Sequence, residues 1–117
     1  MYGMWIHFSR TIKINNCSFY SNYDACKSRD SQCFLSNCQF YDHEVAYHSD
    51  NFYTTLQDTI NNSLFKGNYI GIELYEANGI IEYNEFNNNI FGCYIVNSTY
   101  ELNFNLFVDN TEDLNIE

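Results

Sequence analysis

The sequence predicts an all-β chain, a right-handed parallel β-helix of about five coils with about 21 residues in each. Three observations support this fold class. A phenylalanine returns at gaps of 21, 25, 21 and 21 residues. Columns at fixed distances from it keep their character from one repeat to the next. Within each repeat, apolar and polar residues alternate with the period of two that strands require. A repeat of this length is typical of solenoids, whose units bury their apolar faces by stacking.

Two apolar columns predict the interior of the solenoid. The first is aromatic throughout and holds Phe19, Phe40, Phe65, Phe86 and Phe107. The second lies five positions earlier, is always aliphatic, and holds Ile14, Leu35, Ile60, Ile81 and Leu102. Equivalent residues on successive coils should lie about 4.8 Å apart, the spacing of hydrogen-bonded strands. We therefore expect three short strands in each coil and two continuous apolar ribs inside the stack.

Two further columns predict the bends between strands. Two positions before each phenylalanine the residue is small or polar: Cys17, Cys38, Ser63, Asn84 and Asn105. Three positions after it come Asn22, His43, Asn68, Asn89 and Asn110, where His43 is interpreted as a turn variant rather than a metal ligand. Asparagine tolerates left-handed turns, and its amide can bond along the stack. Because crossovers between parallel strands are overwhelmingly right-handed, we expect a right-handed helix.

Departures from the repeat predict a loop and a partial coil within one domain, residues 1–117. The gap of 25 residues places a loop insertion at about 50–58. Residues 1–11 form a partial coil, because Gly3–Ile6 resembles Gly71–Leu74, and full coils begin at about residue 12. Neither end shows a cap, which predicts a fragment, end-to-end self-association, or protection of the exposed strand edge by acidic side chains.

Charge and composition narrow the partners. The net charge is −10, and all five basic residues precede position 67. Such an acidic surface repels phosphate backbones, so nucleic acid and anionic membranes are poor partners, whereas cations, neutral sugars and basic proteins are favoured. No segment reads as a signal peptide or a membrane span. We expect an extracellular or cell-surface location if the chain is part of a longer exported protein.

The segment from Asn84 to Ile95 resembles a known family. It reads Asn-Glu-Phe-Asn-Asn-Asn-Ile-Phe-Gly-Cys-Tyr-Ile, and the same frame recurs from Ser63 to Leu74. This pattern is similar to the NosD-type right-handed β-helix region of the pectin-lyase-like superfamily, over about residues 12–117. The resemblance implies a domain common in surface and secreted proteins and associated with carbohydrate binding or processing. The name of that family refers to copper, but we expect no copper site here, because the chain has no matching cluster of Met, His and Cys.

One outward column carries the candidate catalytic residues. Eight positions after successive phenylalanines stand Lys27, His48 and Glu73, then Tyr94. The resemblance implies that an active cleft would lie along such a strand face. A base, an acid and a cation on neighbouring coils suffice for acid–base chemistry on a sugar. The alternative is a solvated strand face, whose charged residues simply point outward.

Other residues are candidates for glycan contacts, metal binding and a disulfide. The predicted glycan contacts are Tyr75, Tyr94, Asp50 and Glu76, and Tyr20 and Tyr41 add exposed rings. Asp109, Glu112 and Asp113 could hold calcium, the one cofactor considered, or could form an acidic solvating coil. Cys17 and Cys38 share a column on adjacent coils, so they are close enough for a disulfide or pack as two buried thiols.

Three functions are compatible with these patterns. The leading hypothesis is a non-catalytic β-helix domain for carbohydrate or cell-surface recognition, whose partner is a glycan or a protein surface. The second is a structural spacer or part of a larger surface protein. The third is a polysaccharide lyase, hydrolase or epimerase that uses the face of Lys27, His48 and Glu73.

Overall fold

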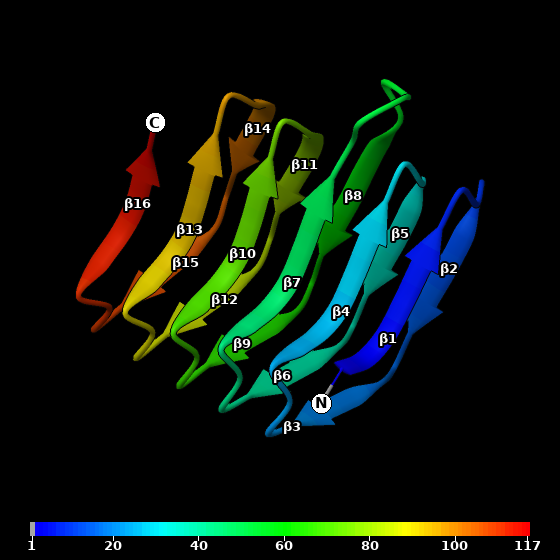
Figure 1. Ribbon diagram of the computed structural model, residues 1–117. Helices are drawn as coiled ribbons and strands as arrows, with labels where there is room; N and C mark the ends of the chain where they lie inside the picture. Colours follow the sequence, from blue (N-terminus) through cyan, green and yellow to red (C-terminus); the bar gives the residue numbers. More distant parts are fainter. Residues whose placement is uncertain (1) are drawn as a thin grey trace.

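The computed structural model describes residues 2–117 and shows a solenoid of parallel strands in three sheets (Figure 1). Sheet A contains, in spatial order, β1 (Tyr2–His7), β4 (Asp24–Arg29), β7 (Val45–Asp50), β10 (Ile70–Tyr75), β13 (Phe91–Val96) and β16 (Glu112–Ile116). Sheet B contains β2 (Ile12–Asn15), β5 (Cys33–Ser36), β8 (Gln57–Asn61), β11 (Asn78–Glu82) and β14 (Thr99–Asn103). Sheet C contains β3 (Ser18–Tyr20), β6 (Gln39–Tyr41), β9 (Leu64–Lys66), β12 (Glu85–Asn87) and β15 (Leu106–Val108). The predicted fold class is confirmed.

The phenylalanine column forms one interior rib in sheet C. Each ring pairs in register with the phenylalanine of the next coil. Adjacent rings are stacked, with centroids 4.8–5.0 Å apart. The middle three, Phe40, Phe65 and Phe86, are fully buried. Opposite them, the aliphatic column pairs in register along sheet B. Both predicted ribs are therefore present, and burial of their apolar surface is the main favourable term for stacking the coils.

Asparagine side chains connect successive coils at the bend between sheets C and A. The Oδ1 atom of Asn68 accepts a hydrogen bond from the His43 backbone N–H at 2.9 Å, and its Nδ2 donates to the Phe40 carbonyl at 3.3 Å. Asn89 repeats both bonds one coil later, to the Asn68 N–H and the Phe65 carbonyl, each at 2.9 Å. The amide thus satisfies one buried donor and one buried acceptor, which would otherwise destabilise the bend.

His43 takes the place of an asparagine in this ladder. Its Nδ1 accepts from the Asn22 backbone N–H at 2.9 Å, and its Nε2 lies 3.0 Å from the Phe19 carbonyl oxygen. These two bonds require a neutral ring with its proton on Nε2. Burial lowers the pKa of His43, which favours the same neutral form. The interpretation of His43 as a turn variant agrees with this geometry.

Cys17 and Cys38 are free thiols in the structure. The Sγ atom of Cys17 lies 3.3 Å from the Asn15 carbonyl oxygen. The Sγ of Cys38 lies 3.3 Å from the Ser36 carbonyl oxygen and 3.6 Å from that of Ile14. Both thiols therefore donate to carbonyls at the bend between sheets B and C, as the amides of Asn84 and Asn105 do three coils later.

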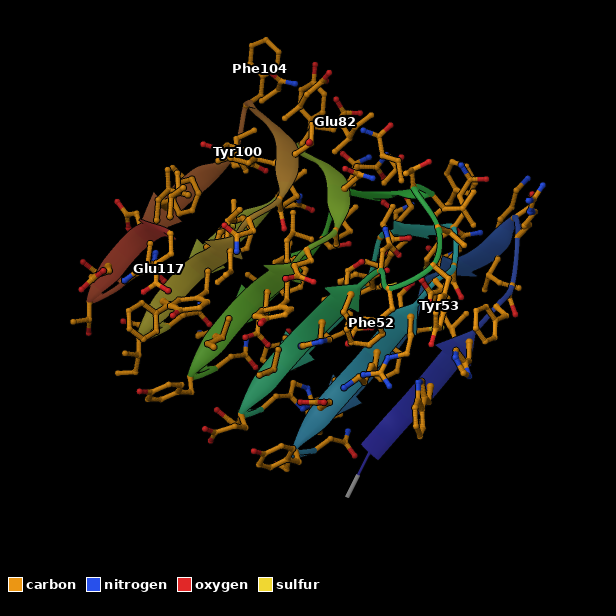
Figure 2. The ribbon with its side chains drawn as sticks, turned by 45° about the horizontal axis from the view of Figure 1, so that its top comes forward. Phe52, Tyr53, Glu82, Tyr100, Phe104 and Glu117 are labelled. Carbon is orange, nitrogen blue, oxygen red and sulfur yellow. The ribbon has the colours of Figure 1, made fainter. Side chains whose placement is uncertain are left out.

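The added residues of the third coil form the connection 51–56 between β7 and β8. This loop is attached to the preceding coil through Asp30, whose Oδ1 accepts from the backbone N–H groups of Phe52 at 2.7 Å and Tyr53 at 2.8 Å. Both rings are exposed on the outside of the solenoid (Figure 2). At the N-terminal end, β1 pairs with β4 as the first strand of sheet A. Across residues 2–117, no helix is long and apolar enough to cross a membrane.

Candidate binding surfaces

The outward face of sheet A brings the three candidate catalytic residues onto adjacent strands. Lys27 pairs in register with His48, and His48 pairs with Glu73. The column continues to Trp5 on one side and Tyr94 on the other. A second outward column, two residues further along each strand, brings Arg29 beside Asp50 and Asp50 beside Tyr75. The repeat therefore places these side chains as the sequence predicts.

His48 lies between two carboxylates. Its Nδ1 is 2.5 Å from Glu73 Oε2, and its Nε2 is 3.0 Å from Asp50 Oδ2. Burial alone would lower the pKa of His48, but the hydrogen bond and charge of Glu73 and the hydrogen bond to Asp50 outweigh it, so the pKa is raised. A carboxylate oxygen at each nitrogen favours the imidazolium form, which can donate to both.

Asp50 is the centre of this cluster. Arg29 donates to both of its carboxylate oxygens at 2.8 Å, and the Lys27 Nζ lies 3.9 Å away. Burial would raise the pKa of Asp50, but the hydrogen bonds from Arg29 and His48 hold it below its ordinary value. The Arg29 guanidinium also lies 4.8 Å from the ring centroid of Phe52, a favourable cation–π geometry. The side chain of Asp50 is only 4% exposed, so the cluster covers it.

The charged side chains of these two outward columns on β4, β7 and β10 are therefore bonded to one another. Both nitrogens of His48 are occupied, so the imidazolium has no lone pair with which to act as a general base. Of the predicted glycan contacts, Asp50 is buried, Tyr94 is half-buried, and Tyr75 and Glu76 are exposed. This arrangement stabilises three consecutive coils at their surface and presents few open polar groups.

The three candidate metal ligands are dispersed over the exposed last coil. The Oδ1 of Asp113 accepts from the Asn110 amide at 3.1 Å, and the Oε2 of Glu112 accepts from the Asn115 amide at 3.1 Å. Asp109 lies in the turn before β16, with φ of 55°. Among residues 2–117, no group of three or more His, Cys, Asp or Glu side chains is placed to hold a metal ion.

Sequence reasoning missed a groove at the bend between sheets B and C. This corner groove has a volume of about 650 Å³ and is lined by residues 37–39, 62–64, 83–85, 104 and 106. It crosses four successive coils. One side is formed by the turn residues that follow sheet B, and the other by the first residues of β6, β9, β12 and β15.

Tyr83 and Phe104 are the aromatic residues of the corner groove. Their rings stack, with centroids 5.2 Å apart and planes at 13°. They are 54% and 79% exposed, and Figure 2 shows Phe104 projecting from the ribbon beyond Tyr100 and Glu82. Their φ angles are +55° and +54°, in the left-handed region that bulky side chains rarely adopt.

The corner groove leaves a signal in the sequence. Three positions before each phenylalanine, the first three coils carry Asn16, Asn37 and Asn62, and the last two carry Tyr83 and Phe104. All five have positive φ. At this turn, the last two coils replace asparagine, which tolerates positive φ, with an aromatic residue, which rarely adopts it. This replacement is the sequence signal of the groove.

Amide and carboxylate groups complete the corner groove. Gln39 and Glu85 point outward from sheet C, and Asn37 and Asn62 are exposed at the turn. The floor is held by bonds between coils: Ser63 Oγ accepts from the Cys38 N–H at 3.1 Å, and Asn84 Oδ1 accepts from the Ser63 N–H at 3.0 Å. The aromatic wall therefore stands on a backbone whose donors are satisfied.

These features define an all-β solenoid with an ion-paired sheet face and an aromatic corner groove. A family model described as the right-handed beta helix region matches residues 1–113. The chain belongs to this right-handed β-helix family. No curated protein matches the chain significantly. No solved structure does so either. The fold and the family support a structural or recognition domain in general, and the NosD-type subtype remains a prediction.

Proposed function

We propose that the chain is a non-catalytic recognition domain that binds neutral carbohydrate in the corner groove. The observation that carries the proposal is the exposed Tyr83–Phe104 stack, held at positive φ beside amide groups. Bulky residues in the left-handed region cost about 1–3 kcal/mol each, and such strained residues cluster at functional sites. Exposed aromatic rings that lack a packing role are suited to contact with a ligand.

The chemistry of the corner groove suits an uncharged sugar. An aromatic ring offers a flat apolar face to the C–H groups of a pyranose, and Tyr83 adds a hydroxyl. Asn37, Gln39 and Asn62 provide amide donors and acceptors for sugar hydroxyls. Glu85 is the only charged residue among those that line the groove, so an anionic sugar would be repelled.

The sheet A cluster supports a catalytic function less well. A general base must have a free lone pair near its working pH, and Glu73 and Asp50 favour the imidazolium form of His48. We expect no cleavage of neutral or acidic polysaccharides by the wild-type chain. Cleavage that disappears in Glu73→Gln and in His48→Ala would instead establish an enzyme on this face.

A glycan screen with matched variants tests the proposal. We expect binding to a neutral glycan, and at least a tenfold loss of affinity in Tyr83→Ala and in Phe104→Ala. The control is Tyr20→Ala, which removes a ring from a similar stack, Tyr20–Tyr41, with centroids 5.1 Å apart outside the groove. This control should bind like the wild type. No binding to any glycan would favour the spacer hypothesis. A loss confined to Tyr20→Ala would move the site to sheet C.

We also propose that the domain acts at a cell surface or outside the cell, as part of a longer exported protein. The net charge of −10 and the acidic C-terminal half suit a partner that is a neutral glycan or a protein surface rather than nucleic acid or a membrane. End-to-end association of β1 and β16 edges remains a second way in which the chain could meet a protein partner.

A further inference from the structure

We infer that the ligand of the corner groove is an extended oligosaccharide chain that lies parallel to the solenoid axis and crosses four coils. This inference rests on the proposed function and adds the form and direction of the ligand. It follows from the repetition of the groove walls, which a terminal sugar on a single coil would not need.

One wall repeats a single backbone position. Asn37, Asn62, Tyr83 and Phe104 occupy the same turn on consecutive coils, with φ of 55°, 49°, 55° and 54°. Successive coils are about 4.8 Å apart, so these side chains span roughly 14 Å along the axis. Each side chain therefore leaves the backbone in the same direction, and together they form a straight row.

The second wall runs beside the first. It consists of the first residues of four sheet C strands, which pair in register in the order Gln39, Leu64, Glu85 and Leu106. Two parallel rows over the same four coils border an open groove, the corner groove, with its long axis along the stack. A ligand that uses both rows along their length must itself be extended.

The chemistry of the corner groove changes along its length. The coils of Asn37 and Asn62 present amides, and those of Tyr83 and Phe104 present a stacked aromatic pair. A single sugar on the rings would leave the amides unused. A chain of several sugars would pack against the exposed sides of the stacked rings at one end and accept hydrogen bonds from the amides at the other. The carboxylate of Glu85, on the coil of Tyr83, favours an uncharged chain.

The corner groove is formed before any ligand arrives. Its floor is fixed by the bonds from Cys38 N–H to Ser63 Oγ and from Ser63 N–H to Asn84 Oδ1, and by the bond from Asn84 N–H to Asn105 Oδ1 at 3.0 Å. A rigid site loses little conformational entropy on binding, so each added sugar contact adds to the affinity.

A length series tests this inference. The probes are neutral oligomers of glucose, mannose and galactose of one to six units, titrated by calorimetry against the full chain. For the series that binds, we expect affinity to rise at least tenfold from the monomer to the tetramer and then to level off, since longer chains extend beyond the groove.

Two sets of variants separate the ends of the corner groove. Asn37→Gly and Asn62→Gly remove an amide, and glycine adopts positive φ without strain. We expect each to weaken tetramer binding at least threefold and to leave monomer binding unchanged. Tyr83→Ala should weaken binding of every length, and Tyr20→Ala should weaken none. Circular dichroism of each variant checks that the fold is intact.

The outcomes distinguish this inference from the proposed function. If monomer and hexamer bind equally tightly and the glycine variants behave like the wild type, the extended ligand is wrong, but carbohydrate recognition stands. If no oligomer and no glycan binds, both fail. If tetramer binding is weakened by Tyr20→Ala rather than by the groove variants, the oligosaccharide binds on the outer face of sheet C. This result would also overturn the inference.

Discussion

Replacing both groove aromatics with asparagine should make the protein more stable while weakening ligand binding at least tenfold. Tyr83 and Phe104 have φ of +55° and +54°, and the left-handed conformation costs roughly 1–2 kcal/mol for a residue with a bulky side chain. Asparagine, which the earlier coils use at this turn, tolerates the same backbone. The substitution Tyr83→Asn combined with Phe104→Asn therefore relieves strain at two positions.

The lost ring stack offsets part of this gain. An aromatic pair contributes about 0.5–1.5 kcal/mol, and the lower end applies here because the rings are 54% and 79% exposed. We therefore expect the double variant to gain about 2 kcal/mol in free energy of unfolding, a rise in Tm of about 8 °C for a chain of this length. Glycan affinity should fall at least tenfold.

Urea unfolding followed by circular dichroism measures the first quantity, and calorimetric titration the second. The matched control is the reverse change, Asn37→Tyr, which places a strained ring on an earlier coil and should cost about 1 kcal/mol. A loss of more than about 1 kcal/mol in the double variant would refute the reasoning, because it would mean that the two rings hold the fold together.

Three further predictions concern the interior and the histidines. Phe65→Ala removes a fully buried ring between Phe40 and Phe86 and should cost about 4 kcal/mol in urea unfolding; a cost below about 1.5 kcal/mol would contradict a packed rib. The folded-state pKa of His43 is lowered, so its contribution to stability is lost as pH falls below about 6.5, and His43→Asn should reduce this loss on urea titration. The pKa of His48 is raised, so its contribution is present below about 6.5 and lost as pH rises through the folded-state pKa; an unchanged alkaline limb in His48→Gln would contradict this.

The interior of the solenoid could be predicted because each column repeats one physical requirement. A buried ring returns on every coil, and so does an amide that must satisfy one donor and one acceptor. His43 shows how far this reasoning extends, since its two nitrogens reproduce the bonds that Asn68 makes with one oxygen and one nitrogen. A period read from the sequence indicates both the position and the role of such residues.

The surface could be predicted only in part. The repeat places Lys27, His48 and Glu73 on adjacent strands, but it does not show that Asp50 gathers the cations of this face. That outcome depends on two rotamers: Arg29 bonds Asp50 directly across the strands, and His48 reaches two positions along its own strand to Asp50. Side-chain torsions on an outward face depend on which partners lie within reach. The aligned columns of the repeat do not predict these torsions.

The corner groove was missed because its signal is a departure from the repeat. Asparagine at positive φ is ordinary, so the column of Asn16, Asn37 and Asn62 reads as turn chemistry. Tyr83 and Phe104 acquire meaning only when the backbone shows that they keep the same conformation at a cost.

The remaining question is why the solenoid tolerates strained aromatic residues at all, and Phe8 provides the comparison. Phe8 also has positive φ, at 50°, but its ring stacks on His7 at 4.1 Å and lies 6.1 Å from Tyr53, so packing offsets its strain. Among the residues that the structure describes, the rings of Tyr83 and Phe104 contact no aromatic ring except each other. An exposed pair with so little internal packing is not explained by stability, since asparagine would serve the turn better. Under the proposed function, contact with a ligand would supply this compensation.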